Sequence, residues 1–383
     1  MGSGLKPRIV VSGVNLVELG PLTVFREALR SLVGVHGDAY EIVGLVHRKV
    51  LFEIPGVTYL EFPGIKGSWI RRLRFEYFES LRISKRLRPR LWVAMHDMTP
   101  RVISEQQVTY CHNPAPFYGF DFKEAMLDPK FGFFMLFYRF LYRIYLHRNT
   151  AVIVQQDWIR KEFTRRYGAG NVIVAFPTIK PSPTSVSQLS KNSREIYRFF
   201  YPAFARTFKN HRLLLEAVLL LERRKVDGFE VMITINAASN RCAADLFRRY
   251  SNLQKVSWLG VISRQRVCEL YGESDCLVFP SKLETWGLPL TEFKATGKPI
   301  LVADLPYAHE TIGSYDQVVF FDALDSVELA DQMERAIRGT LKWKTAHGTT
   351  INEPFAGDWE ALWKLLLHGV PSSAACKAET SSS

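Results

Sequence analysis

The sequence contains few of the residues and patterns that mark several large classes of protein. Only five of its 383 residues are cysteines, and they are scattered without metal-ligand spacing. This argues against a disulfide scaffold and indicates a reducing, cytosolic compartment. The most apolar stretch, residues 131–146, is interrupted by Arg139 and Arg143, and arginines inside a bilayer are costly, so no transmembrane helix is expected. The first residues also lack the charged-then-apolar order of a signal peptide.

Acidic residues are outnumbered by basic ones, 38 against 50, which gives a formal net charge of +12. The excess is concentrated between Lys66 and Arg90, where nine basic residues face only Glu76 and Glu79. Such a field favours phosphates, nucleic acid or an anionic membrane face, although a solvated helical face is the simpler alternative. A nucleic-acid-binding protein would also need a known binding module, or aromatic and Arg residues on an exposed sheet, and we identify none.

What the sequence does contain is a regular alternation of apolar runs and helical patterns in both halves. This is typical of α/β domains with parallel, doubly wound sheets. The strands are expected at residues 8–13, 41–47, 58–63, 91–96, 108–112, 151–155 and 172–177, and then at 195–203, 230–236, 256–260, 276–279, 300–303 and 318–322. The helices are expected at residues 22–33, 68–87, 131–148 and 157–167, and then at 211–223, 243–250, 264–271, 289–296 and 326–337.

A change of composition divides the two halves. Residues 180–193 are dominated by Pro, Ser and Thr and have no periodicity, which is typical of a linker. The length of the chain also suits two domains. We predict an N-terminal domain over residues 1–179, a linker over 180–194, a second domain over 195–345, a C-terminal segment with one amphipathic helix (358–368) over 346–370, and a disordered tail over 371–383.

Residues 275–304 have the most informative pattern, because a strand leads through a polar loop into a helix opened by Pro289. Glu284 in the loop and Glu292 in the first helical turn are separated by seven residues. Both would lie at the carboxyl edge of a parallel sheet, where open α/β sheets bind ligands. The helix N-terminus beside them favours phosphate. An ordinary surface helix, with Glu292 merely favoured by the helix dipole, is the alternative.

Two basic residues stand just before the helix predicted at residues 211–223. Arg206 and Lys209 precede Asn210, which is a plausible N-cap. A cation at a helix N-terminus is electrostatically unfavourable unless it shares an anion. The pattern therefore indicates a phosphate clamp, with two solvated basic residues as the alternative.

Histidines follow two of the predicted strands in the first half. His112 ends the strand expected at residues 108–112, and the proline after Asn113 forces an extended exit, which leaves the imidazole at the carboxyl edge of the sheet. His96, beside Asp97, follows the preceding strand and is the rival candidate. A lone histidine is more often structural, so both interpretations stay open.

Gly20 lies between the first predicted strand and Pro21. A glycine there lets the backbone approach a ligand closely, although an ordinary turn explains it equally well. The loop lacks the pattern G-x-G-x-x-G, which argues against a dinucleotide-binding oxidoreductase.

The segment from Glu284 to Glu292 reads E-T-W-G-L-P-L-T-E. It resembles the signature of retaining glycosyltransferases of the family-4 type, in which two Glu residues flank an aromatic-Gly-Leu-Pro core. Thr285-Trp286 stands where a Gly-Phe pair is usual. The resemblance extends over residues 8–370 and implies the GT-B fold, an α/β architecture of two doubly wound Rossmann-like domains facing a central cleft.

The resemblance also implies roles for the residues of the second half. Glu284 would lie beside the donor sugar, near its developing ring charge, and Glu292 would hold the ribose hydroxyls of the nucleotide. The amides of Gly287 and Leu288 would face the phosphates. The backbone around Ile262 would read the nucleobase.

Further roles are implied by the same resemblance. Lys209 and Arg206 would grip the donor diphosphate, although the glycine usual before the Arg is replaced here. His112 would contact the donor sugar, and Gly20 would lie in the loop beside the sugar and phosphate. Asp97 is a candidate contact for an acceptor hydroxyl, and the C-terminal helix would pack back on the first domain.

These residues together predict a retaining glycosyltransferase. It would move a hexose-type sugar from a UDP- or GDP-sugar to a glycan acceptor, in cell-surface polysaccharide or lipopolysaccharide biosynthesis. No D-x-D motif stands out, so we expect metal independence and no cofactor, and we expect no nucleic-acid partner. A nucleotide-sugar epimerase of the same fold and a basic nucleic-acid-binding protein are the alternatives.

The acceptor side is the least informative part of the sequence. Residues 131–148 combine eight aromatic residues with three arginines. Together with the basic stretch at residues 66–90 they could dock on an anionic membrane surface and reach a lipid-linked saccharide. A helix buried in the N-terminal core explains the aromatic residues equally well. We therefore expect a cytoplasmic protein, peripheral at the inner face of the membrane.

Overall fold

The computed structural model describes residues 6–17, 19–119, 126–178 and 196–368. The chain divides into two compact units. The first comprises Met1–Phe117, Met135–Lys180 and Ile351–Ser383, and the second comprises Tyr118–Phe134 and Pro181–Thr350. The predicted linker over residues 180–194 and the predicted tail over 371–383 lie outside the described residues.

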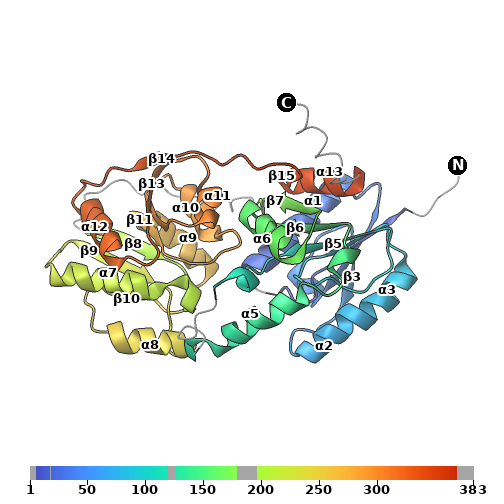
Figure 1. The fold of residues 1–383 in the computed structure, drawn as a ribbon, viewed down its shortest axis with the longest axis horizontal. Coiled ribbons are helices and arrows are strands. Elements are labelled where there is room, and N and C mark those ends of the chain that lie inside the picture. Colours follow the sequence, from blue (N-terminus) through green and yellow to red (C-terminus); the bar gives the residue numbers. More distant parts are fainter. Residues whose placement is uncertain (1–5, 18, 120–125, 179–195, 369–383) are drawn as a thin grey trace. The chain divides into compact units, whose positions relative to one another are not determined.

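The first unit is built on a sheet of eight strands, and each pair of neighbouring strands is parallel (Figure 1). In sheet order the strands are β15 (Phe355–Ala356), β7 (Val172–Ala175), β6 (Ala151–Val154), β5 (Gln106–Cys111), β4 (Leu91–Ala94), β1 (Arg8–Ser12), β2 (Glu41–Val46) and β3 (Val57–Glu61). The predicted strands are all present. The two-residue strand β15 was not predicted, because it contains no apolar run.

The helical segments of this unit follow its strands. They are α1 (Leu19–His36), η1 (Lys49–Leu51), α2 (Trp69–Arg74), η2 (Phe75–Glu79), α3 (Ser80–Leu87), η3 (Ala115–Phe117), α5 (Pro129–Leu141, in this unit from Met135 on), η4 (Leu146–Arg148), α6 (Asp157–Tyr167) and α13 (Trp359–His368). Figure 1 shows α13 beside α1, and the two helices share one core with the sheet. The indole of Trp363 donates to the Ala28 carbonyl at 3.2 Å. This agrees with the packing that the resemblance implies.

Two of the predicted helices are interrupted. The helix expected over residues 68–87 contains the π-helical segment η2, which buries both Phe75 and Glu76. The helix expected over residues 131–148 ends at Leu141. Tyr145 adopts a left-handed backbone conformation with φ of 57°, which a right-handed helix does not accommodate. The aromatic periodicity continues past this point and gave no sign of the break.

The second unit is built on a sheet of seven strands. In sheet order they are β10 (Val256–Trp258), β9 (Phe229–Ile233), β8 (Tyr197–Tyr201), β11 (Cys276–Phe279), β12 (Ile300–Ala303), β13 (Tyr315–Phe321) and β14 (Lys344–Ala346). The strands are parallel except for β14, which pairs antiparallel with β13 and was not predicted because it is polar and largely exposed. The helical segments are η5 (Thr207–Lys209), α7 (His211–Arg223), α8 (Arg241–Tyr250), α9 (Arg264–Glu273), α10 (Leu288–Lys294), α11 (Pro306–Ile312) and α12 (Ser326–Ile337).

The strand orders fix where each unit can bind a ligand. In the first sheet the order changes direction between β1 and β4, and in the second between β8 and β11. The loops on either side of such a point diverge to opposite faces of the sheet, which leaves a crevice at the carboxyl ends of the strands. No helix in the described part of the chain is long and apolar enough to cross a membrane.

Candidate functional site

Lys209 and Glu284 meet at the point where the strand order of the second sheet changes direction. Lys209 ends η5, after β8, and Glu284 lies in the loop after β11. The ammonium of Lys209 is 2.5 Å from the Glu284 carboxylate, and the two side chains are 21% and 12% exposed. Solvent therefore reaches both groups only in part. The sequence indicated no anion beside Lys209, and the structure shows that the carboxylate of Glu284, a predicted catalytic residue, neutralises it.

Asn210 ties together three loops around this ion pair. Its backbone is left-handed, with φ of 56°, and its side chain does not cap α7. The side-chain amide instead donates to the carbonyls of Pro280 at 3.1 Å and Ala323 at 2.9 Å. The predicted N-cap bond is therefore absent. The buried amide holds the loop after β8 against the loops after β11 and β13.

Gly287 precedes α10 and Leu288 is its first residue, so the helix begins one residue earlier than the expected start at Pro289. Gly287 has φ of 79°, and a Cβ atom there would lie 3.2 Å from the Leu290 side chain, so only glycine fits without strain. The neighbouring Trp286 is buried, and its indole donates to the Thr291 hydroxyl at 2.9 Å. The residue that departs from the usual motif thus anchors the loop to the helix.

Glu292 is the fifth residue of α10 and already has three hydrogen-bond donors. Arg264, at the start of α9, donates to both carboxylate oxygens at 2.8 and 2.5 Å. The Tyr271 hydroxyl donates to one of them at 2.9 Å. The Glu292 side chain is 15% exposed and that of Arg264 is 64% exposed. The guanidinium is therefore the partner that a ligand can displace.

The remaining predicted residues of this unit lie nearby along the same edge. The Arg206 guanidinium is bound to the Asp128 carboxylate at 2.8 and 3.1 Å, so this cation too is neutralised within the second unit. Ile262 lies in the turn between β10 and α9, two residues before Arg264, and is partly exposed. Neither position conflicts with its predicted role.

His112 follows β5 in the first unit and is held through its main chain. The Oδ1 atom of Asp97 accepts the amide hydrogens of His112 at 2.5 Å and Asn113 at 2.9 Å. Burial lowers the pKa of His112 to about 3, so the imidazole is neutral at physiological pH. Its Nε2 atom is buried and has no hydrogen-bond partner among the described residues. Burial also raises the pKa of Asp97 to about 6.

His96 is buried below this loop rather than presented to a ligand. Its Nε2 atom is 3.1 Å from the Ser12 hydroxyl, and its Nδ1 atom is 3.3 Å from the Glu76 carboxyl group. Arg72 donates to the His96 carbonyl at 2.7 Å. Burial lowers the pKa of His96 well below its usual value and raises that of Glu76 to about 8. His96 and Glu76 are therefore both neutral when paired near neutral pH.

Gly20 lies in the first turn of α1, which begins at Leu19. The sequence had placed it in the loop before the helix, opened by Pro21. The glycine and His112 both belong to the first unit, as do the candidates His96 and Asp97, whereas the residues predicted to bind the nucleotide and diphosphate from residue 206 on belong to the second. Their joint use in one site stays a prediction.

Sequence reasoning missed three residues that bind predicted site residues: Arg264, Tyr271 and Asp128. Arg264 is a cation at a helix N-terminus, the same signal that singled out Lys209, so the rule would have found it if applied to every helix. Tyr271 and Asp128 carried no comparable signal. Among the described residues no group of three or more His, Cys, Asp or Glu side chains is placed to hold a metal ion, and metal independence stays a prediction.

Comparisons with known proteins identify relatives of the chain in sequence and in fold. Residues 182–348 match the family model described as glycosyl transferases group 1, so the second half carries a glycosyltransferase group 1 domain. The chain is 23% identical to the O-antigen chain mannosyltransferase RfbU of Salmonella typhimurium over 299 residues, which cover 75% of this chain and 78% of that protein.

Solved structures resemble the chain over nearly its whole length. HepE from Anabaena, in complex with UDP and glucose, is 15% identical with a TM-score of 0.61, and the match covers 98% of this chain and 99% of that one. WaaG, a glycosyltransferase involved in lipopolysaccharide biosynthesis, is 15% identical with a TM-score of 0.60, covering 86% and 90%. The predicted GT-B fold, with two Rossmann-like domains, is confirmed.

Proposed function

We propose that this glycosyltransferase moves a hexose-type sugar from a UDP- or GDP-sugar to a saccharide acceptor, with retention of anomeric configuration and without a metal ion. The observation that carries the proposal is the pair of ion pairs Lys209–Glu284 and Arg264–Glu292. Glu284 lies before α10 and Glu292 within it, and both belong to the glycosyltransferase group 1 domain. A sugar nucleotide offers these pairs new partners: a diphosphate for Lys209, a sugar ring that becomes cationic as its bond breaks for Glu284, and ribose hydroxyls for Glu292.

Binding of the donor would exchange partners in both pairs. The ammonium of Lys209 would turn to the diphosphate, whose negative charge grows as the glycosidic bond breaks. Glu284, released from Lys209, would then lie beside the sugar ring, whose positive charge grows at the same time. Glu292 would exchange the Arg264 guanidinium for two ribose hydroxyls. Retention then follows if the acceptor hydroxyl attacks the anomeric carbon on the face that the diphosphate leaves, as the bond to the diphosphate oxygen breaks and the hydroxyl proton passes to the departing diphosphate.

The acceptor is proposed to be a glycan of the cell surface. RfbU is named as an O-antigen chain mannosyltransferase and WaaG as an enzyme of lipopolysaccharide biosynthesis. These names support an acceptor of that class. Mannose, from a GDP-linked donor, is accordingly one of the first sugars to test, beside the UDP-linked hexoses.

Nucleotide binding is the direct test of this function. UDP and GDP, each at about 100 times its dissociation constant, would stabilise the protein by about 2.7 kcal/mol. That corresponds to a rise in Tm of about 5–10 °C. Protection by neither nucleotide would contradict the proposal. A panel of nucleotide sugars then identifies the donor: a transferase releases nucleoside diphosphate when acceptor is added, whereas an epimerase interconverts the sugar and releases none.

We further propose that the first unit docks on an anionic membrane surface. Helix α5 buries Met135 and Tyr138 but exposes Leu136 and Phe140, which are 54% and 65% exposed. Trp69 of α2 packs against Phe137 of α5 with ring centroids 5.2 Å apart. One face of the helix is thus buried in the core, and the other leaves an exposed apolar surface that supports the proposed docking.

The neighbouring segments α2, η2 and α3 add exposed apolar and basic side chains. Ile70 and Phe78 add large side chains that are 80% and 60% exposed. Exposed basic residues of the same segments are Arg71, Arg74, Arg82, Lys85 and Arg86. An apolar face flanked by cations is typical of helices that lie in the interface of an anionic bilayer.

Co-sedimentation with vesicles tests the docking surface. Binding should require anionic phospholipid, should weaken with salt, and should fall when Ile70 and Phe140 are both changed to Ser. Val50 is 64% exposed in η1, so Val50→Ser is the matched control and should leave binding unchanged. Absence of vesicle binding at low salt would refute the proposal that this surface docks on a membrane.

A further inference from the structure

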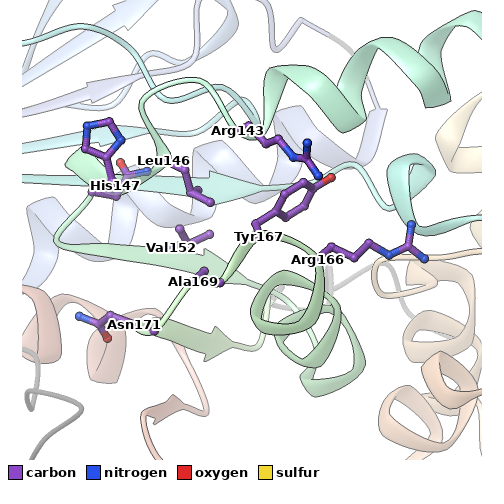
Figure 2. Close-up of a pocket in the computed structure, with 11 residues that line it drawn as sticks. Arg143, Leu146, His147, Val152, Arg166, Tyr167, Ala169 and Asn171 are labelled. Atoms are coloured by element: carbon purple, nitrogen blue, oxygen red, sulfur yellow. The ribbon is translucent and has the colours of Figure 1, made fainter.

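A hollow of about 460 Å³ lies in the first unit, away from the residues discussed so far. Its walls come from the turn after α5, the start of β6, and the loop between α6 and β7 (Figure 2). Two of the residues that line it, Asn149 and Asn171, lie just before the first residues of β6 and β7. They therefore mark the amino edge of the parallel sheet. Asp97 and His112 follow β4 and β5 at the carboxyl edge, so the hollow is a separate site.

The lining is basic and contains no Asp or Glu. Arg143 is exposed, and its guanidinium forms no ion pair with any described residue; it rests 5.9 Å from the centre of the Tyr167 ring. Figure 2 shows the Arg143 side chain reaching toward the ring of Tyr167. His147 contributes a second exposed, basic side chain. A ligand that complements this lining is therefore an anion.

Two further arginines, Arg139 and Arg166, lie close to each other beside Arg143. Arg139 and Arg166 both donate to the Pro116 carbonyl, at 2.9 and 2.8 Å, which brings the two guanidiniums together. Arg166 is also paired with Glu162, which in addition binds Arg165. Arginine side chains therefore gather at this part of the first unit.

Tyr167 supplies a second, independent sign of a ligand. Its hydroxyl is buried and has no hydrogen-bond partner among the described residues, and an unpaired buried polar group costs about 1–3 kcal/mol. The hydroxyl belongs to the same side chain over which Arg143 lies. An oxygen atom held by the guanidinium would give this hydroxyl an acceptor.

The loop between α6 and β7 leaves room for such a ligand. Gly168 closes α6 with φ of 64°, and Gly170 follows two residues later. A Cβ atom on either glycine would meet nothing within 4 Å. Leu146 and Val152 add apolar surface to the lining. The hollow thus suits an anionic group attached to a carbon skeleton.

We propose that this hollow binds the phosphate group of a phosphorylated ligand. The Arg143 guanidinium would hold two phosphate oxygens through parallel N–H bonds, the Tyr167 hydroxyl would donate to one of them, and Leu146 and Val152 would contact the attached carbon atoms. The site goes beyond the proposed glycosyl transfer and does not depend on it. A membrane lipid or a soluble phosphate ester would each present the same group.

Calorimetric titration of the full chain with inorganic phosphate tests the site, at constant ionic strength with chloride as the replacement anion. Saturable binding is expected, and its absence would refute the proposal. The titration is repeated with Lys209→Met, because the predicted diphosphate site is also basic. The binding should persist in that variant. Its complete loss would assign the phosphate to Lys209 and overturn the proposal.

Variants of the lining identify the residues that act. Arg143→Ala should weaken phosphate binding at least about tenfold, since a charge-assisted bidentate contact is lost, and Tyr167→Phe should weaken it about threefold. Arg148→Ala is the matched control, because this exposed arginine is stacked on Tyr145 at 4.6 Å and does not line the hollow. Equal losses for Arg143→Ala and Arg148→Ala would mean diffuse attraction alone and would overturn the proposal.

Vesicles containing phosphatidic acid distinguish the two sources of phosphate. Arg143 lies two residues after α5, whose exposed apolar face forms part of the proposed docking surface. If a lipid headgroup is the ligand, Arg143→Ala should lower the affinity for these vesicles more than Arg148→Ala does. If a soluble phosphate ester is the ligand, the two variants should bind vesicles equally while differing in phosphate affinity. Either result supports the phosphate site and identifies which of the two ligands provides the phosphate group.

Discussion

Asp97 acts on His112 through the main chain rather than through the imidazole. Its carboxylate accepts the amide hydrogens of His112 and Asn113. Its own backbone is left-handed, with φ of 71°, a conformation that costs energy for a residue other than glycine. The Tyr142 hydroxyl, 3.5 Å from the same oxygen atom, donates to the Asn113 carbonyl at 2.8 Å. The strain and the shared contacts indicate that Asp97 positions the loop that presents His112.

Turnover should depend on the hydrogen-bond acceptor atom of Asp97 rather than on its negative charge. Asp97→Asn keeps an oxygen atom for both amides and should retain the turnover of the donor sugar within about threefold. Asp97→Ala removes the acceptor and should lower turnover at least about tenfold. Steady-state kinetics with the identified donor measure both. Equal losses in the two variants would mean that the charge acts directly.

A double-mutant cycle separates this role from a general loss of stability. In a His112→Ala background, Asp97→Ala should cause little further loss of turnover, because the residue that it positions is already gone. Full additivity of the two losses would contradict the positioning role. If His112→Ala itself left turnover unchanged, the predicted contact of His112 with the donor sugar would fail instead.

Glu76 should make the stability of the protein depend on pH. Burial raises its pKa to about 8 in the folded state, from 4.5, so the folded protein keeps a proton that the unfolded chain releases. Its contribution is complete below about pH 4.5 and is lost as pH rises toward about 8, by up to about 1.4 kcal/mol per pH unit. Glu76→Gln is neutral throughout. Its Tm relative to that of the unmodified protein should therefore increase between about pH 5 and about pH 8, by several °C.

A carboxylate on the same segment provides the control for this measurement. Glu79 also belongs to η2 but is 33% exposed and paired with Arg82. Glu79→Gln should therefore shift Tm by a similar amount at both ends of the pH range. A constant difference for Glu76→Gln as well would show that Glu76 is not the group responsible.

At the residue scale, the sequence singled out a side chain more readily where its unfavourable position could be recognised from the neighbouring residues alone. Lys209 was predicted because a cation before a helix needs an anion, and the structure supplies one in Glu284. Glu76 gave no such sign. Phe75 and Glu76 are both buried in the π-helical turn of η2. A departure from the ordinary helical period cannot be read from apolar spacing.

At the scale of single elements, α9 and α10 are joined by the bidentate contact between Arg264 and Glu292. The contact holds the carboxylate in place while no nucleotide is bound. Glu292→Ala should reduce the affinity for the nucleoside diphosphate at least about tenfold, because two charge-assisted hydrogen bonds to the ribose are lost. Calorimetric titration with UDP and GDP measures this. An unchanged affinity would remove Glu292 from the ribose site.

A neighbouring glutamate tests whether charge alone is responsible. Glu269 lies on α9, where it is exposed and paired with Arg266. Glu269→Ala removes the same charge from the same surface of the second unit. It should change nucleotide affinity by less than about twofold.

The elements themselves were largely predictable. Strands β4, β6, β11 and β12 are short apolar runs that are buried throughout, and such runs are typical of parallel sheets. The break in the helix expected over residues 131–148 was not predictable, because it depends on the conformation of Tyr145 and not on its apolar character. The short strands β14 and β15 also have no local signature, since pairing with β13 and β7 creates them.

At the scale of the whole molecule, α13 completes the core of the first unit. Trp359 and Trp363 are 5% and 0% exposed and pack in one cluster with α1. Trp363→Ala should destabilise the first unit by about 3–5 kcal/mol, through lost burial and the cavity left behind. Denaturant unfolding measures the change. Lys364→Ala, on the exposed face of the same helix, is the control and should stay within about 0.5 kcal/mol.

The position of α13 also has a consequence for the order in which the chain becomes able to fold during synthesis. The ribosome makes the strands β1 to β7 first, but the helix that covers α1 is made only after the whole of the second unit. The second unit, whose last residue is Thr350, can therefore fold while the first still lacks part of its core. Until Trp363 emerges, the apolar face of α1 remains available to chaperones and to other nascent chains. The last helix thus decides when the first unit becomes a finished, protected domain.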